Sequence, residues 1–107
     1  MKGTHLRFYT YENRRHGSAL LYEWLLERAK ALDVHGGSAF RAIAGFGRHG
    51  ILHEEHFFEL SADMTVVIEF VVGAEEAEKM LAFLRREKVS IFYTRVQGEF
   101  GVIEGDR

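Results

Sequence analysis

The run from Met64 to Val72 limits most strongly what this chain can fold into. It is rich in β-branched residues, which favour strands, and almost every position is apolar. Successive side chains of a strand point to opposite faces, so Val67 and Val71 lie on one face and the remaining aliphatic residues on the other. A strand with one solvated face alternates apolar and polar residues instead. The run therefore predicts a strand that is covered on both faces.

Strand periodicity recurs in three other segments. Thr4 to Thr10 alternates around Leu6 and Phe8, which predicts a first strand. Two further strands are expected at Ala39 to Gly45 and at Ser90 to Gln97.

Two helices are predicted by apolar residues that recur at three- and four-residue intervals. The first begins after Ser18, which can cap it, and is stopped by Gly36 and Gly37. The second follows Gly73 and has an apolar stripe formed by Ala77, Met80, Leu81 and Leu84.

The predicted order is strand, helix, strand, strand, helix, strand, which is the split βαβ or ferredoxin-like arrangement (βαββαβ) of the α+β class. It places both helices on one face of a four-stranded antiparallel sheet. With 107 residues, a single domain spanning residues 1–107 is expected. The face without helices is left bare, and the two-sided apolar character of Met64 to Val72 predicts that it packs against other copies of the chain.

Glu69 interrupts this apolar run. An acidic side chain in such a place is expected to pair with a cation, and Arg7, Arg41 and Arg95 are the candidates on the same sheet.

The charge balance and the absence of cysteine exclude several classes of function. Fourteen basic residues against 16 acidic residues give a net charge of -2, so no affinity for nucleic acid is expected. Disulfides, thiolate chemistry and cysteine-based zinc sites are excluded because there is no cysteine. No segment has the apolar length of a signal peptide or a membrane span, so we expect a cytoplasmic protein without direct membrane insertion.

Several motifs resemble those of a known family: the run Tyr9 to His16, Leu21-Tyr22-Glu23, Arg41 to Gly47, and Leu52-His53. Together they resemble the prokaryotic domain-of-unknown-function family one-ninety, whose members have a PII-like fold. The resemblance spans about Leu6 to Gln97. Its most specific part is the Gly-Phe-Gly ending at Gly47 with the Leu-His that follows.

The resemblance implies a regulatory role. Members look like PII signal-transduction proteins and CutA-type proteins, which are ferredoxin-like subunits that associate as trimers through their sheets. In PII proteins, the long loop between the second and third strands reaches toward a partner, often a membrane transporter, and adenine nucleotides bind between subunits. By this resemblance the loop is Gly47 to Asp63, the chain is a homotrimer, and an adenine nucleotide is a candidate ligand.

The glycine-rich stretch that ends the second predicted strand is the candidate ligand site. Its Gly-x-Gly-x-x-Gly spacing matches a dinucleotide fingerprint, but no helix opens directly behind it, which argues against that fold. Glycines can still let backbone N–H groups converge on an anion, with nearby arginines adding charge. Alternatively, they only turn the chain or let subunits approach closely. The candidate ligand-binding residues are Arg41, Gly45, Gly47, Arg48, Gly50 and His53.

Three histidines follow this stretch at spacings of four and three residues: His49, His53 and His56. On a helix they would share one face and could ligate a metal ion, as in a metal-binding CutA-like protein. Alternatively, they are solvated loop residues.

Two other functions share the split βαβ plan. An acylphosphatase-like hydrolase would cradle phosphate in the loop after the first strand. Here that loop, Tyr11 to His16, has Arg and Asn but no glycine before Gly17. An RNA-binding domain would need aromatic residues on the third strand, where this chain has aliphatic ones. We expect no catalytic residues and leave the enzymatic alternative open.

Overall fold

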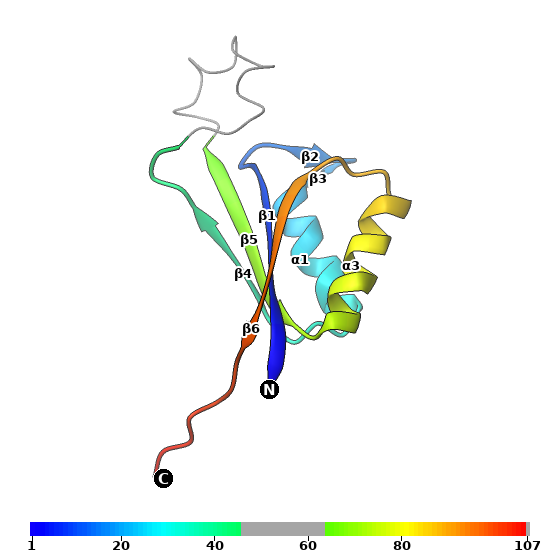
Figure 1. The fold of residues 1–107 in the computed structure, drawn as a ribbon. Helices are drawn as coiled ribbons and strands as arrows, with labels where there is room; N and C mark the ends of the chain where they lie inside the picture. The colour runs from blue at the N-terminus through cyan, green and yellow to red at the C-terminus, as the bar shows by residue number, and fades with distance from the viewer. Residues whose placement is uncertain (46–63, 107) are drawn as a thin grey trace.

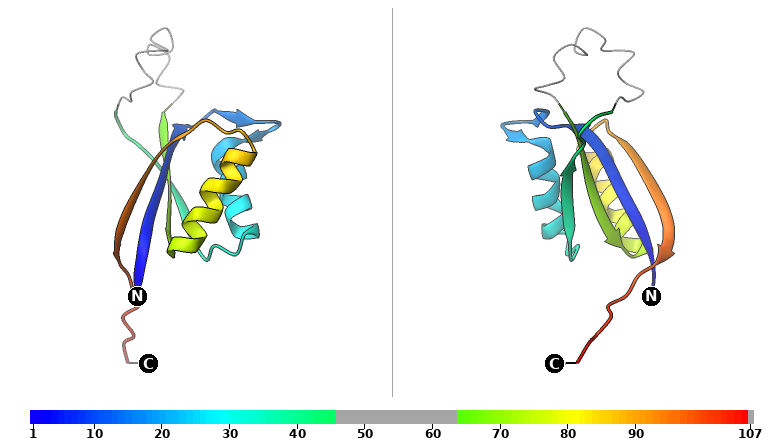
Figure 2. Two further views of the ribbon diagram at one scale, coloured as in Figure 1. Left: turned by 45° about the vertical axis from the view of Figure 1, so that its right-hand side comes forward. Right: turned by 90° about the vertical axis from the view of Figure 1, so that its left-hand side faces the viewer.

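The computed structural model describes residues 1–45 and 64–106. Its main sheet is antiparallel, with the strands in the order β4 (Gly37–Arg41), β5 (Thr65–Val72), β1 (Lys2–Tyr11) and β6 (Phe92–Glu99). The helices α1 (Leu21–Ala31) and α3 (Ala74–Arg86) lie side by side on one face of this sheet, as Figures 1 and 2 show. This confirms the ferredoxin-like arrangement predicted from the sequence.

The core lies between the sheet and the two helices. Leu6 and Phe8 of β1 and Ile68 of β5 are completely buried, because alternate residues of these strands face the helices. Phe8 also meets Phe70 edge to face, with 6.2 Å between the ring centroids. Burial of each such side chain contributes about 1.5–3 kcal/mol to the stability of the fold.

Helix α3 follows the prediction closely. The four residues of its predicted apolar stripe are all buried. At its start, Glu76 Oε1 accepts a hydrogen bond of 2.6 Å from the backbone N–H of Gly73. Acidic residues lie in the first turn and basic residues in the last, as the helix dipole favours.

Helix α1 differs from the prediction at both ends. Ser18 does not cap it, because the next two residues form β3 (Ala19–Leu20), which pairs with β2 (Arg15–His16) in a small hairpin, and the helix begins only after that. The hairpin was not predicted, because two-residue strands have no detectable period. The helix ends at Ala31, before the glycines, and Asp33 adopts the left-handed conformation (φ 66°) that was expected of glycine.

The two edge strands are displaced from their predicted limits. β4 begins two residues earlier than predicted and ends at Arg41 rather than Gly45. Gly37 belongs to β4 because its backbone pairs with Phe70 of β5. A Cβ at Gly37 would overlap the Phe70 ring. β6 is shifted by two residues toward the C-terminus.

No helix among residues 1–45 and 64–106 is long and apolar enough to cross a membrane.

Candidate functional site

Only two of the predicted ligand-binding residues, Arg41 and Gly45, lie in the described part of the chain. Gly45 has open space where a Cβ would be. The others lie outside the described residues, as do the three histidines proposed as metal ligands and the predicted loop: Gly47, Arg48, Gly50, His53, His49, His56 and the segment from Gly47 to Asp63. Within the described residues, no three His, Asp or Glu side chains are grouped so that they could hold a metal ion.

Arg41 is held by Glu12, a partner that the sequence did not reveal. Arg41 Nε donates a hydrogen bond of 3.0 Å to Glu12 Oε1, and Nη2 donates to Glu12 Oε2. The two bonds form a bidentate ion pair, which lowers the pKa of the Glu12 carboxyl group and raises that of the Arg41 guanidinium. An anion that binds to Arg41 must therefore compete with Glu12.

This ion pair lies at the end of the sheet where β1 and β4 end and β5 begins. Glu12 directly follows β1 and Arg41 ends β4, so the pair joins two strands on either side of β5. Backbone bonds of 2.8 Å reinforce it, from Glu12 N–H to Met64 O and from Ala42 N–H to Thr65 O. We call the Glu12–Arg41 pair the clasp.

Two backbone N–H groups of the turn after β1, where an acylphosphatase would cradle phosphate, already have partners within the chain. The N–H groups of Glu12 and Arg14 are already bonded to the carbonyl oxygens of Met64 and Tyr11. Arg15 Nη1 donates to Ser18 O at 2.8 Å within the small hairpin. The Arg14 side chain is half-buried, and the loss of solvent lowers its pKa.

His16 connects this hairpin to the helices. Its ring centroid lies 4.1 Å from that of Trp24 on α1. Its Nε2 is 3.5 Å from Glu87 Oε1 at the end of α3. Trp24 in turn stacks on Phe83. The hairpin is therefore packed against both helices.

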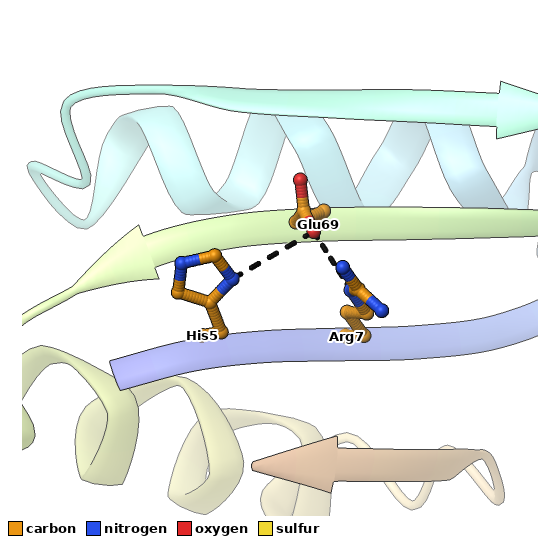
Figure 3. A network of polar contacts seen from close by, with 3 residues as sticks. All are labelled: His5, Arg7 and Glu69. Atoms are coloured by element: carbon orange, nitrogen blue, oxygen red, sulfur yellow. Dashed lines mark hydrogen bonds and ion pairs between the residues drawn. The ribbon is translucent and has the colours of Figure 1, made fainter. Parts of the chain in front are cut away.

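The face of the sheet opposite the helices, which we call the bare face, carries a polar group at its centre. Figure 3 shows the Glu69 carboxylate between His5 and Arg7. Arg7 Nε donates a hydrogen bond of 2.7 Å to Glu69 Oε2, and His5 Nδ1 lies 3.9 Å from the same oxygen. The bond to Glu69 raises the pKa of Arg7. The prediction that Glu69 pairs with an arginine of the sheet is confirmed for Arg7.

The other two arginine candidates have different partners. Arg41 bonds to Glu12, and Arg95 of β6 bonds to Glu78 of α3. In the register of the sheet, Arg95 is opposite the buried Leu6 and Arg41 is opposite the buried Val66, so both lie on the helix side. Glu69 faces the other side.

Apolar side chains surround the polar group on the bare face. Tyr9 and Phe92 are neighbours there, with ring centroids 5.5 Å apart, and exposed hydrophobic residues occur on three strands. These residues, placed by the strand register, are Phe40, Val71, Phe92 and Val96. An apolar sheet face of this kind is typical of an association surface.

Two shallow hollows occur on the described surface. One lies beside the C-terminal residues and is lined by Met1, Glu99, Phe100, Gly101, Val102 and Ile103. The other lies between the helices, next to Asp33 and Lys79. Neither is lined by Arg41 or Gly45.

The order and pairing of the strands, the two helices on one face and the bare opposite face define a PII-like ferredoxin fold. The chain belongs to the DUF190 family ("Uncharacterized ACR, COG1993"), whose model matches residues 3–96. It is 36% identical over 83 residues to a UPF0166 protein from Aquifex aeolicus, covering 78% of this chain and 76% of that one. A UPF0166 protein from Methanocaldococcus jannaschii is 27% identical over 81 residues, covering 76% of this chain and 74% of that one.

Two solved structures share the fold. A protein from Thermus thermophilus described as PII-like and assigned to signalling superposes with a TM-score of 0.60 at 18% identity, covering 92% of this chain and 87% of that one. A nitrogen regulatory PII-like protein from Thiomonas intermedia, bound to ADP, AMP and bicarbonate, superposes with a TM-score of 0.52 at 19% identity, covering 95% and 98%. At these identities the likeness concerns the fold.

Proposed function

We propose that this chain is a cytoplasmic PII-like regulatory subunit, consisting of one domain, that associates as a trimer through its bare face. It binds a small molecule near the loop base at residues 45–50 and contacts a partner protein, such as a membrane transporter, through the segment from Gly47 to Asp63. The observation that carries this proposal is the fold, which is shared with a nitrogen regulatory protein bound to adenine nucleotides.

The position of the clasp suggests how a ligand could act. Arg41 and Glu12 join the ends of β4 and β1 beside the start of β5. A phosphate group that binds near Gly45 would compete with Glu12 for the Arg41 guanidinium. A ligand shifts a conformational equilibrium only by its difference in affinity for the two states, and replacement of the clasp would supply such a difference.

Binding of ATP, ADP or AMP tests the ligand part of the proposal. A ligand present at 100 times its dissociation constant adds about 2.7 kcal/mol to the free energy of unfolding, so millimolar nucleotide should raise the melting temperature measurably. Calorimetric titration would then give the affinity. A melting temperature unchanged by all three nucleotides, together with no heat of binding, contradicts a nucleotide ligand.

Two arginine variants locate the site. Arg41→Gln should remove most of the nucleotide response, because it deletes the guanidinium at the loop base. Arg95→Gln is the matched control, since Arg95 pairs with Glu78 of α3 and lies away from the clasp. An equal response in the wild type and both variants would place the ligand elsewhere.

A further inference from the structure

A row of polar side chains crosses the bare face from one edge of the sheet to the other. Glu69 of β5 is opposite Arg7 of β1 on one side and opposite Ser38 of β4 on the other, and Arg7 is also opposite Thr94 of β6. Residues that are directly opposite each other on neighbouring strands share one face of a sheet, so these four side chains lie in line. We call Ser38, Glu69, Arg7 and Thr94 the polar row.

Mainly apolar side chains flank the polar row on both sides. They occupy the positions two residues away along each strand, which belong to the same face. One flanking row consists of Phe40, Val67, Tyr9 and Phe92, and the other of Val71, His5 and Val96. A typical interface has an apolar centre and a polar rim, whereas here the charges lie between two apolar bands. Any surface that covers the apolar bands therefore also covers the polar row.

The two charges of the polar row can each form a second bond. The bond between them joins Arg7 Nε to Glu69 Oε2, so the terminal nitrogens of the guanidinium and the other carboxylate oxygen take no part in it. Figure 3 shows that oxygen pointing away from His5 and Arg7. The side chains of Arg7 and Glu69 are 46% and 24% exposed. A further ion pair can therefore form without breaking the one within the chain.

The charges of the polar row determine what can cover it. A purely apolar surface would enclose both charges and leave their remaining donors and acceptors unpaired, which is costly. The covering surface must instead carry an anion that reaches Arg7 and a cation that reaches Glu69. The bare face of a second copy supplies both, because the polar row contains one charge of each sign. Sheets packed face to face keep their strand directions within about 30° of each other, so two rows that cross the strands would also run along each other.

We propose that the polar rows of neighbouring copies meet, and that Arg7 of each copy bonds both to its own Glu69 and to the partner subunit's Glu69. The apolar bands supply the area of the contact, while the alternating charges fix its register and exclude surfaces that lack the same order of charges. This inference rests on the proposed association through the bare face. It assigns the two residues by which a copy selects another copy as its partner.

A charge exchange tests whether the ion pairs extend between copies. The double variant Arg7→Glu with Glu69→Arg keeps an ion pair within each chain and should associate with itself, but it would place like charges opposite each other when it meets a wild-type chain. Isotopically labelled variant and unlabelled wild type are dissociated together, reassembled and analysed by native mass spectrometry. We expect at least about tenfold fewer mixed oligomers than random assembly gives, because like charges in an interface repel each other.

The matched control exchanges a pair on the helix side of the sheet. Arg95 bonds to Glu78 there, so the double variant Arg95→Glu with Glu78→Arg should mix with the wild type at random. Random mixing of the bare-face variant as well would show that each Arg7–Glu69 pair stays within its own chain. The inference would then be wrong while the oligomer stands. If the wild type is itself a monomer at all concentrations, the proposed association is wrong as well.

Two single variants replace the charge exchange if its circular dichroism spectrum shows that it does not fold. Arg7→Met and Glu69→Met each remove one charge, so each leaves the other charge without a partner, both in its own chain and in a neighbouring copy of the same variant. In an equimolar mixture, Arg7 of one variant can bond to Glu69 of the other. The mixture should therefore associate about tenfold more tightly than either variant alone, as measured by light scattering. No gain on mixing would overturn the pairing between copies.

Discussion

Arg7 and Glu69 face each other on adjacent strands of the bare face, with 2.7 Å between Nε and Oε2. Both side chains keep some access to solvent in the single chain. In the isolated chain such a pair contributes little, because water screens it. The pair matters more if a second subunit covers the bare face. Loss of one partner would then leave the other charge unpaired inside an interface.

Glu69→Gln should therefore affect association far more than folding. The variant keeps the shape of the side chain but removes the charge that balances Arg7. We expect the dissociation constant of the oligomer to rise by about tenfold or more, with little change in the unfolding of the isolated chain. Analytical ultracentrifugation measures the first quantity and denaturant titration of dilute protein the second.

The double variant Arg7→Met with Glu69→Met is the control for the prediction that an unpaired Arg7 weakens association. Replacing both charges with apolar groups leaves nothing unpaired, so association should recover to near the wild-type level or exceed it. If Glu69→Gln and the wild type associate equally, the bare face is not the interface.

The clasp should make stability depend on pH in the acidic range. The Arg41 guanidinium lowers the pKa of Glu12 below its ordinary value of 4.5, whereas the unfolded chain keeps that ordinary value. The contribution of the clasp is therefore fully present above about pH 4.5 and is lost as the pH falls through the lowered pKa. Glu12→Gln cannot form the ion pair at any pH.

The measurement is the difference in free energy of unfolding between the wild type and Glu12→Gln at several pH values. This difference should be constant near neutral pH and should shrink below pH 4.5. Because both side chains are accessible to solvent, high salt should also reduce it. A difference that stays the same down to pH 3 would show that Glu12 acts through something other than its charge.

Phe8 and Phe40 provide a matched test of the two faces. Phe8 is completely buried between the sheet and the helices, whereas Phe40 is on the bare face. Phe8→Ala should lower the free energy of unfolding by about 3–5 kcal/mol because it leaves a cavity. Phe40→Ala should lower it by less than about 1 kcal/mol in dilute protein. Similar losses in the two variants would contradict the assignment of the faces.

The sequence was sufficient for the fold because the decisive patterns are local and strong. Alternation in the first strand and the two-sided apolar run from Met64 to Val72 identified the central strands, and the stripe of α3 was recognised residue by residue. The ends of α1 and β4 were less predictable. They depend on tertiary features: the small hairpin before Leu21, and the close approach of Gly37 to Phe70.

Less of the candidate site than of the fold could be predicted from the sequence. Arg41 was recognised as a charge near the glycines, but its partner Glu12 is 29 residues away and meets it only when β1 and β4 flank β5. The Arg7–Glu69 pair was anticipated because an acidic residue within an apolar strand needs a partner. Most of the other predicted ligand residues lie within residues 46–63, where the predictions remain to be tested.

Gly3 and Gly98 provide the last test, which concerns the packing of Phe100 against β1. They are opposite each other on β1 and β6, yet their surroundings differ. A methyl group at Gly3 would overlap the ring of Phe100, whereas the space beside Gly98 is open. Gly3→Ala must displace Phe100 and should lower the free energy of unfolding by about 1–3 kcal/mol, as overpacking does.

Gly98→Ala is the control, and it should leave stability unchanged or raise it slightly, because alanine costs less conformational entropy than glycine. Denaturant titrations of the two variants give the comparison. Equal stability of the two variants would mean that the Phe100 ring is not held over Gly3.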